Sequence, residues 1–300
     1  MKRKIILILI AINAINISYG QELDSTQIFI NEIEQSLYYQ YGTIDLQEGH
    51  ARIKVPDGLK FLDKEQSIYV LSDLWGNPVD STIQGMLIPE SKGVFDYDSW
   101  VFTITYEELG YINDEDAEDF DYDELEQDLI NESEEVNPER IKQGYDPIYF
   151  IGWASPPYYD QEKKVLHWAK EYRFGEDTEN TLNYNLQILG RKGVYLFNAI
   201  SLISQFNNVD ANIDKVLNSI EFDNGYTYFD FDPEIDEVAK WTIGGLVAGK
   251  ILAKIGFFAL LIKFWKVIAI GFISVFGFLW KKKKKNNSSA INKNERNNNE

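Results

Sequence analysis

The chain contains no cysteine, and only two of its 300 residues are histidine. Without cysteine there is no disulfide framework, no thiolate zinc site and no cysteine nucleophile. His50 and His167 are too few for a multi-histidine metal centre. The sequence also contains no Gly-x-Ser-x-Gly, Ser-x-x-Lys, Gly-x-Gly-x-x-Gly or P-loop pattern. Whether the protein is an enzyme is therefore uncertain, and a binding or structural role is favoured.

Positive charge is scarce over most of the chain. Asp and Glu total 48 against 29 Lys and Arg, which gives a net charge of −19. Many of the basic residues gather near the two ends, so residues 21–240 are strongly acidic. Binding of nucleic acid needs the opposite sign of charge, because the contacts are made to phosphates. We therefore exclude nucleic acid as a partner.

The region from 107 to 139 is rich in Asp and Glu and contains no Lys or Arg. Carboxylate oxygens are ligands that hard cations prefer, and three side chains have the spacing of positions 1, 3 and 5 of a calcium loop. These are Asp114, Asp116 and Glu118. Asp119, however, stands where such a loop needs glycine. No cofactor is predicted, and Ca²⁺ binding stays an open alternative.

The favoured interpretation of this region is a solvated acidic loop that leads into a helix. Asp121 or Asp123 would cap the helix at its N-terminus. Leu125, Leu129 and Val136 have the spacing of an inward-facing side. We expect these acids to be mainly a charged surface.

The first residues, MKRKIILILIAINAINISYGQE, have the layout of a secretory signal peptide. Three basic residues precede a short apolar run, and small residues follow before Gln21. The run is short for a membrane span of about 20 residues. We predict a signal peptide over 1–20 and export of the chain that follows.

A second apolar segment, from 257 to 280, is long enough to cross a bilayer as a helix. Basic residues after it favour a cytoplasmic tail, and two tryptophans are placed to mark the interfaces. We expect Lys263 and Lys266 to extend towards lipid headgroups. The predicted anchoring residues are Trp265, Trp280, Lys281, Lys282 and Lys283. Residues 281–300 are then a basic, and further on disordered, tail in the cytoplasm.

The stretch 241–256 places small residues at helical spacing, namely Gly245, Gly249, Ala253 and Gly256. Such a stripe allows two membrane helices to approach closely and favours self-association. The alternative is a helix that packs its small face on the adjacent domain.

Residues 21–240 are long enough for one domain with a single substantial core. Alternating and apolar runs with turn signals predict consecutive antiparallel strands in the second half. Helices are expected over 26–40, 63–75 and 208–220, a β-hairpin over 51–63 and a last strand over 225–231. The predicted class is α+β, with a large mainly antiparallel sheet, a few packed helices and a C-terminal transmembrane helix.

The stretch GWASPPYYD, from 152 to 160, combines aromatic rings with a carboxylate. It supplies a candidate platform for a sugar or a peptide, formed by Trp153, Tyr158, Tyr159 and Asp160. The alternative is that Pro156 and Pro157 form a stiff turn whose aromatic rings fill the core.

Several motifs occur together in one order along the chain: VPDGLKFLD, LWGNP, GYINDEDAEDFDYDEL, GWASPPYYD, HWAKEYRFG, TLNYNLQILGRKGV and KWTIGGLVAGKILAKIG. In this the chain resembles a bacterial family of predicted membrane-anchored proteins, domain of unknown function 2167, over residues 25–280. The resemblance implies an exported domain, a C-terminal anchor and no assigned activity. His167 stands where the family is expected to carry tyrosine.

These observations predict a bacterial envelope protein anchored in the cell membrane by one helix. Its acidic domain would lie outside the cytoplasm, in the periplasm if the cell is Gram-negative. The expected partners are the bilayer and either another protein or a second copy of the chain. The alternative is a hydrolase that uses two carboxylates on an envelope polymer.

Overall fold

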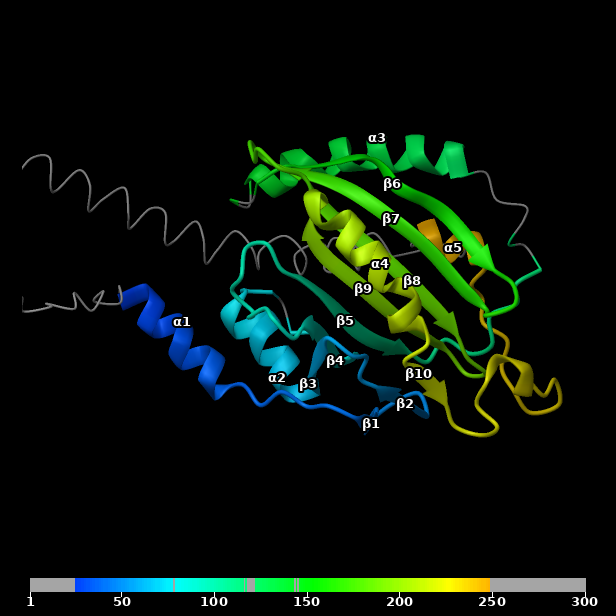
Figure 1. The fold of residues 1–300 in the computed structure, drawn as a ribbon. Coiled ribbons are helices and arrows are strands. Elements are labelled where there is room, and N and C mark those ends of the chain that lie inside the picture. Colours follow the sequence, from blue (N-terminus) through cyan, green and yellow to red (C-terminus); the bar gives the residue numbers. More distant parts are fainter. Residues whose placement is uncertain are drawn as a thin grey trace, which may run out of the picture.

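The computed structural model describes residues 25–248, apart from positions 78, 116, 118–121, 143 and 145. Its centre is a seven-stranded antiparallel sheet with the order β3-β4-β5-β9-β8-β7-β6 (Figure 1). The strands are β3 (Leu59–Asp63), β4 (Ile83–Pro89), β5 (Trp100–Glu107), β6 (Ile148–Asp160), β7 (Val165–Phe174), β8 (Thr181–Leu189) and β9 (Val194–Leu202). The predicted α+β class with a large antiparallel sheet is confirmed.

One face of this sheet is covered by α4 (Phe206–Leu217), which lies over β8 and β9 in Figure 1. Its buried residues Val209, Ile213 and Val216 are spaced by four and three, so they share one side of the helix. They pack in one cluster with alternate residues of the strands, such as Tyr184 and Leu186. Apolar side chains that recur every two residues in the strands and every 3.6 residues in the helix thus form the main core.

The opposite face of the sheet carries three separate apolar clusters. α1 (Ser25–Ser36), α2 (Lys64–Ile68) and the π-helical turn η1 (Tyr69–Leu74) supply residues to the first, over β3 and β4. α5 (Ile243–Ala248) covers the second, near one end of β7 and β8. α3 (Tyr122–Lys142) covers the third, over the free edge at β6. α2 begins as predicted, because Asp63 accepts a 3.0 Å hydrogen bond from the backbone N–H of Gln66.

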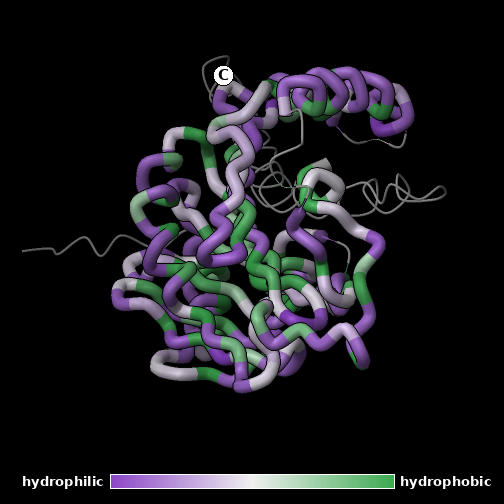
Figure 2. Tube along the Cα trace, turned by 90° about the vertical axis from the view of Figure 1, so that its right-hand side faces the viewer, coloured by the Kyte–Doolittle hydropathy of each residue, from purple (hydrophilic) through white to green (hydrophobic). Residues whose placement is uncertain are grey.

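α3 runs along the β6 edge and is mostly hydrophilic on its outer side (Figure 2). Leu125 is buried, as the spacing predicted, and Leu129 is partly buried. Asn137 fixes the far end, since its side chain donates to the carbonyl of Ile148 at 2.9 Å and accepts from its N–H at 2.7 Å. The side-chain amide of Asn137 thus pairs with both backbone groups of Ile148, as a neighbouring strand would.

The predicted hairpin over 51–63 is wrong. A turn does form at Asp57 and Gly58, but it joins strands of two different sheets. β2 (Ala51–Lys54) pairs with β1 (Thr43–Asp45) and β10 (Ile220–Phe222), whereas β3 pairs with β4. The reason is competition from distant segments, because the N–H of Lys54 donates to Ser219. Local turn chemistry does not reveal such partners.

The predicted turn at Pro156 and Pro157 is also wrong, because both lie inside β6. β6 is the edge strand, and its register against β7 shifts between Ser155 and Tyr158. Proline is tolerated there because an edge strand has one side without a partner and a bulge leaves residues out of the ladder.

The predicted last strand over 225–231 is a short 3₁₀ turn instead, η3 (Tyr228–Asp230). Asp230 closes it, since its carboxylate accepts hydrogen bonds from both the hydroxyl and the N–H of Thr227. A side chain that bonds to its own backbone in this way competes with strand pairing.

In the part of the chain that the structure describes, no helix has both the length and the apolar character that a membrane span requires. The predicted signal peptide over 1–20 and the predicted span over 257–280 lie outside the described residues.

Candidate functional site

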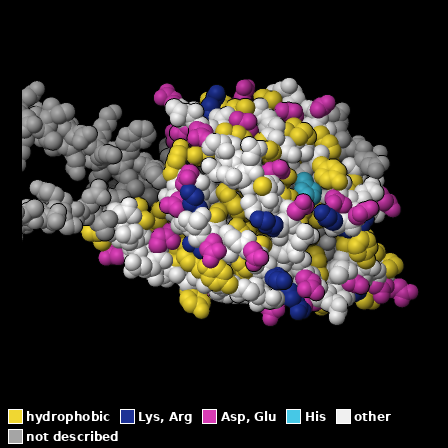
Figure 3. All heavy atoms as spheres, viewed as in Figure 1, with side chains coloured by type: hydrophobic (Ala, Val, Ile, Leu, Met, Phe, Trp, Pro, Cys, Tyr) yellow, Lys and Arg dark blue, Asp and Glu magenta, His cyan; other side chains and the backbone are white. Residues whose placement is uncertain are grey.

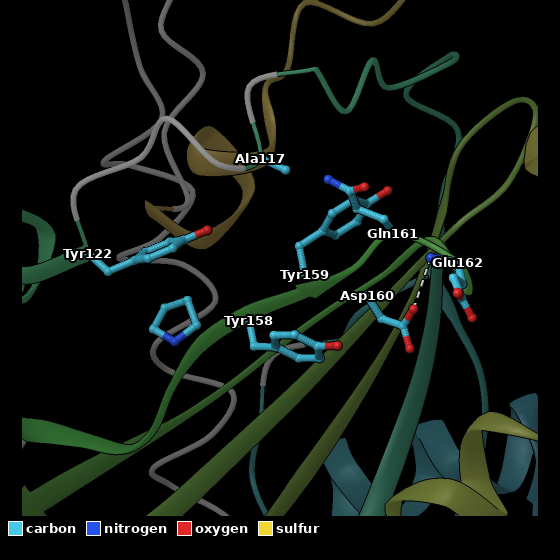
Figure 4. A pocket seen from close by; sticks show the side chains of 8 residues that line it. Ala117, Tyr122, Tyr158, Tyr159, Asp160, Gln161 and Glu162 are labelled. Carbon is cyan, nitrogen blue, oxygen red and sulfur yellow. Dashed lines mark hydrogen bonds between the residues drawn. The ribbon is translucent and has the colours of Figure 1, made fainter.

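A surface pocket of about 540 Å³ lies where β6 ends and turns into β7 (Figure 4). Its lining comes from the end of β6, the β6–β7 turn, the start of α3 and the segment before α3. The lining residues are Ala117, Tyr122, Pro157, Tyr158, Tyr159, Asp160, Gln161 and Glu162. Three of the four residues of the predicted platform, Tyr158, Tyr159 and Asp160, therefore line one hollow.

Tyr158 is the most accessible ring of the pocket, since 60% of the residue is exposed. It lies directly opposite His167 in the β6–β7 ladder, and the two ring centroids are 5.7 Å apart. The predicted strand position of His167 is confirmed. Burial lowers the pKa of His167, although the nearby charge of Asp160 opposes the shift.

Asp160 is used by the turn. One of its carboxylate oxygens accepts hydrogen bonds from the backbone N–H groups of Glu162 at 3.0 Å and Lys163 at 2.9 Å. This is the pattern by which Asp stabilises a tight turn. Glu162, the other acid of the pocket, is exposed. The described lining residues therefore present negative charge at the rim of the pocket and include no pair of buried carboxylates.

Tyr159 connects the pocket to a partly buried cluster around Asp114. The Tyr159 hydroxyl donates to Asp114 at 2.7 Å, and the Lys164 ammonium lies 2.6 Å from the same oxygen. Tyr228 donates to the other oxygen at 3.0 Å. Burial raises the pKa of Asp114, but the hydrogen bonds from Lys164 and the two tyrosines outweigh it, and the pKa is held below its usual range.

The sequence interpretation placed Asp114 in a candidate calcium loop. In the structure both of its carboxylate oxygens already accept hydrogen bonds from protein groups, one of them from a lysine. No three acidic or histidine side chains form a metal site among the described residues. Asp116 and Glu118 lie outside those residues, so the calcium prediction stays untested.

Trp153, the fourth member of the predicted platform, does not line the pocket. It lies farther back along β6 and packs edge-on against Phe150, with ring centroids 5.4 Å apart. Its partner in the ladder is Lys170, whose ammonium lies 5.8 Å from the Trp153 ring. Sequence proximity grouped it with Tyr158, but the bulges between them separate the two positions.

The small-residue stripe begins in α5. Gly245 is buried, and its neighbours Ile243, Leu246 and Val247 belong to the apolar cluster over β7 and β8. The first turn of the predicted helix thus packs on its own domain, and self-association through the stripe stays a prediction. Gly249, Ala253 and Gly256 lie outside the described residues, as do the anchoring residues Trp265, Trp280, Lys281, Lys282 and Lys283.

The sequence did not predict an ion pair that joins the β8–β9 turn to the segment before α5. Arg191, in the β8–β9 turn, pairs with Asp236 at 2.7 Å and donates to the carbonyl of Gly225 at 2.9 Å. Both charged side chains are largely buried. The hydrogen bond from Arg191 holds the pKa of Asp236 below its usual range. The pair fixes the segment that leads to α5.

Charged side chains of both signs are interspersed on the face that carries α4 (Figure 3).

Three solved structures illustrate distant likenesses of the chain. PsbP (CyanoP) from Synechocystis sp. PCC 6803 is 11% identical with a TM-score of 0.34, covering 62% of this chain and 92% of that chain. The Ran-binding protein Mog1p of Saccharomyces cerevisiae is 10% identical with a TM-score of 0.32, covering 62% and 96%. LpqN of Mycobacterium tuberculosis, involved in cell envelope biogenesis, is 9% identical with a TM-score of 0.30, covering 66% and 96%. Likenesses at this level carry no functional argument.

No curated protein matches the chain. A family model, described as protein of unknown function (DUF2167), matches residues 38–277. The matched range includes the whole central sheet, the pocket and the segment after α5. The chain therefore belongs to the DUF2167 family.

Proposed function

We propose that this chain is a single-pass protein of the bacterial cell envelope that binds a partner protein outside the cytoplasm. The signal-like segment 1–20 would export the acidic domain, and the apolar segment 257–280 would anchor it with the basic tail in the cytoplasm. The sequence patterns at the two ends support this topology. The pocket at the β6–β7 turn supports the binding role.

The observation that carries the binding role is the exposed ring of Tyr158 beside the carboxylates of Asp160 and Glu162. A Lys or Arg side chain is attracted to an aromatic face, and the exposed carboxylate of Glu162 adds to that attraction. Asp160 contributes less, because it already lies 4.0 Å from the Lys163 ammonium. The net charge of −19 favours encounter with a basic surface. The proposed partner therefore presents a cationic segment to the pocket.

The test is site-specific photo-crosslinking of the full-length protein in living cells. A photoreactive residue at position 158 is compared with one at position 38, because Tyr38 is also an exposed tyrosine, at 73%, but lies near α1. We expect an adduct from 158 only, and we expect Glu162→Gln to weaken it several-fold. Adducts of equal yield at both positions, or a yield indifferent to the charge at 162, would contradict the proposal.

The mass of the crosslinked adduct distinguishes a second copy of the chain from a different partner protein. An adduct of twice the mass of the chain indicates a second copy, and any other mass indicates a different protein. Protease added to intact spheroplasts tests the topology independently. We expect the domain to be digested and the tail at 281–300 to be spared.

The alternative function, a carboxylate-based hydrolase, needs two acids flanking one bond in a cleft. Asp160 and Glu162 are the acids that line the pocket, and Asp160 bonds to its own turn while Glu162 is exposed. The geometry of the described pocket favours binding over hydrolysis.

A further inference from the structure

The sheet face opposite α4 has a polar centre between its three apolar clusters. Residues directly opposite one another in an antiparallel ladder point to the same side. The register therefore places Lys170 of β7 beside Asn183 of β8, and Asn185 beside Asn198 of β9. Thr103 of β5 follows Asn198 in the same row. We call these residues, with Trp153, Trp168 and Gln187, the polar sheet face.

Most side chains of the polar sheet face are buried. Asn183 and Trp168 are 4% exposed, Gln187 is 8% exposed and Asn198 is 9% exposed. Such groups normally have hydrogen-bond partners, because an unpaired polar group that is removed from water costs about 1–3 kcal/mol. Here several partners are missing among the described residues. The unpaired atoms are Trp153 Nε1, Trp168 Nε1, Asn183 Nδ2, Gln187 Oε1 and Asn198 Oδ1.

Five unpaired atoms on one face of four adjacent strands form a pattern that a folded core alone does not explain. Neighbouring strands lie about 4.8 Å apart, so the span from β7 to β9 is about 10 Å. Apolar clusters surround the polar centre, as in ligand sites where a few polar groups fix orientation within an apolar rim.

The chemistry of the unpaired atoms identifies the kind of ligand. Each primary amide offers a donor and an acceptor, which matches a hydroxyl group that both accepts and donates. A fully deprotonated anion such as sulfate has no proton for the amide oxygens of Gln187 and Asn198. Lys170 adds a positive charge, and its ammonium lies within about 6 Å of the Trp153 and Trp168 rings. A carboxylate on the ligand would pair with that charge.

We propose that the polar sheet face binds an acidic saccharide, whose carboxylate pairs with Lys170 and whose hydroxyl groups pair with the amides of β8 and β9. The site is separate from the pocket at the β6–β7 turn. Saccharide binding here and partner binding at the pocket are therefore tested independently of each other. Burial lowers the pKa of Lys170 to about 8, against the opposing charge of Glu132 on α3. Lys170 is therefore still mainly protonated at neutral pH and available to a carboxylate.

The experiment is titration calorimetry on the full-length protein in a detergent without a sugar headgroup. The probes are carboxylated sugars (trigalacturonic acid and N-acetylmuramic acid), the neutral cellotriose and inorganic phosphate. We expect the wild type to bind a carboxylated sugar. Lys170→Met should weaken that binding about 10- to 100-fold, since hydrogen bonds to charged groups contribute about 1.5–3 kcal/mol. Lys142→Met is the matched control, because the side chain of Lys142 is 77% exposed on α3.

Gln187→Leu provides a second variant that keeps the charge and removes one amide. We expect it to weaken both carboxylated and neutral sugars. Three results would overturn the proposal: no binding of any carboxylated sugar at millimolar concentration, binding of phosphate alone, or equal binding by wild type and Lys170→Met. The first would mean that the unpaired groups bind water only.

Discussion

Lys170 provides a test of the buried polar sheet face that needs no ligand. Desolvation lowers the pKa of its ammonium from 10.5 to about 8 in the folded protein, although Glu132 opposes the shift. The charged form is therefore penalised by folding. The penalty is fully present below about pH 8 and is relieved as the pH rises towards the unfolded value. Wild-type stability should thus rise over this range relative to a variant with no charge here.

Lys170→Met supplies that variant with a side chain of similar length. A difference of about 2.5 pKa units corresponds to about 3 kcal/mol of unfolding free energy at pH 7 to 8. The gap between the variant and the wild type should shrink to about 1 kcal/mol by pH 10. The pKa of about 8 already includes the attraction between Lys170 and Glu132, so the expected gap needs no separate correction for it.

The assay is urea unfolding of the full-length protein in detergent, followed by tryptophan fluorescence at pH 7, 8, 9 and 10. Tyrosine ionisation affects both proteins alike, so the difference between them isolates Lys170. Lys142→Met should show no trend with pH, because its side chain is exposed. A gap that stays constant from pH 7 to 10 would refute the assigned burial of Lys170.

Three further predictions concern the packing around the sheet. Asp114→Asn should lower the unfolding free energy by about 2 kcal/mol at pH 7, because Lys164 loses a charged partner. On acidification, the difference in unfolding free energy between the wild type and this variant should disappear as the pH falls through the depressed pKa of Asp114. Arg191→Leu should release the segment around Asp236 and raise its amide exchange with solvent, whereas exchange in α4 should stay unchanged. Gly85→Ala should cost about 1–3 kcal/mol in urea unfolding, because its Cβ would overlap a fully buried ring of β3.

Regular periodicity was the reliable signal for the fold. The antiparallel strands β7, β8 and β9 and the helix α4 repeat apolar residues at spacings that depend only on backbone geometry. The predictions for these elements are confirmed. The hairpin after β2 was wrong because strand pairing is a choice among distant partners, and here Ser219 accepts the hydrogen bond of Lys54.

The candidate site was predictable in part. Aromatic and acidic residues clustered in GWASPPYYD indicated the pocket, and Tyr158, Tyr159 and Asp160 do line it. Trp153 could not be excluded by sequence, since the bulges of β6 are set by pairing with β7. The partners of Asp114 come from two segments far from it in the chain, one with Tyr159 and Lys164 and one with Tyr228, so no local pattern indicated them.

The sequence by itself determined the α+β class, the acidic character of the domain and the absence of cysteine chemistry. These follow from composition and from short-range spacing, which are properties of the chain before it folds. Only the tertiary structure decided which polar side chains meet. The polar sheet face arises because Lys170, Asn183 and Asn198 fall on one side of the sheet when three strands pair in register. A shift of one residue would place each of them on the other face.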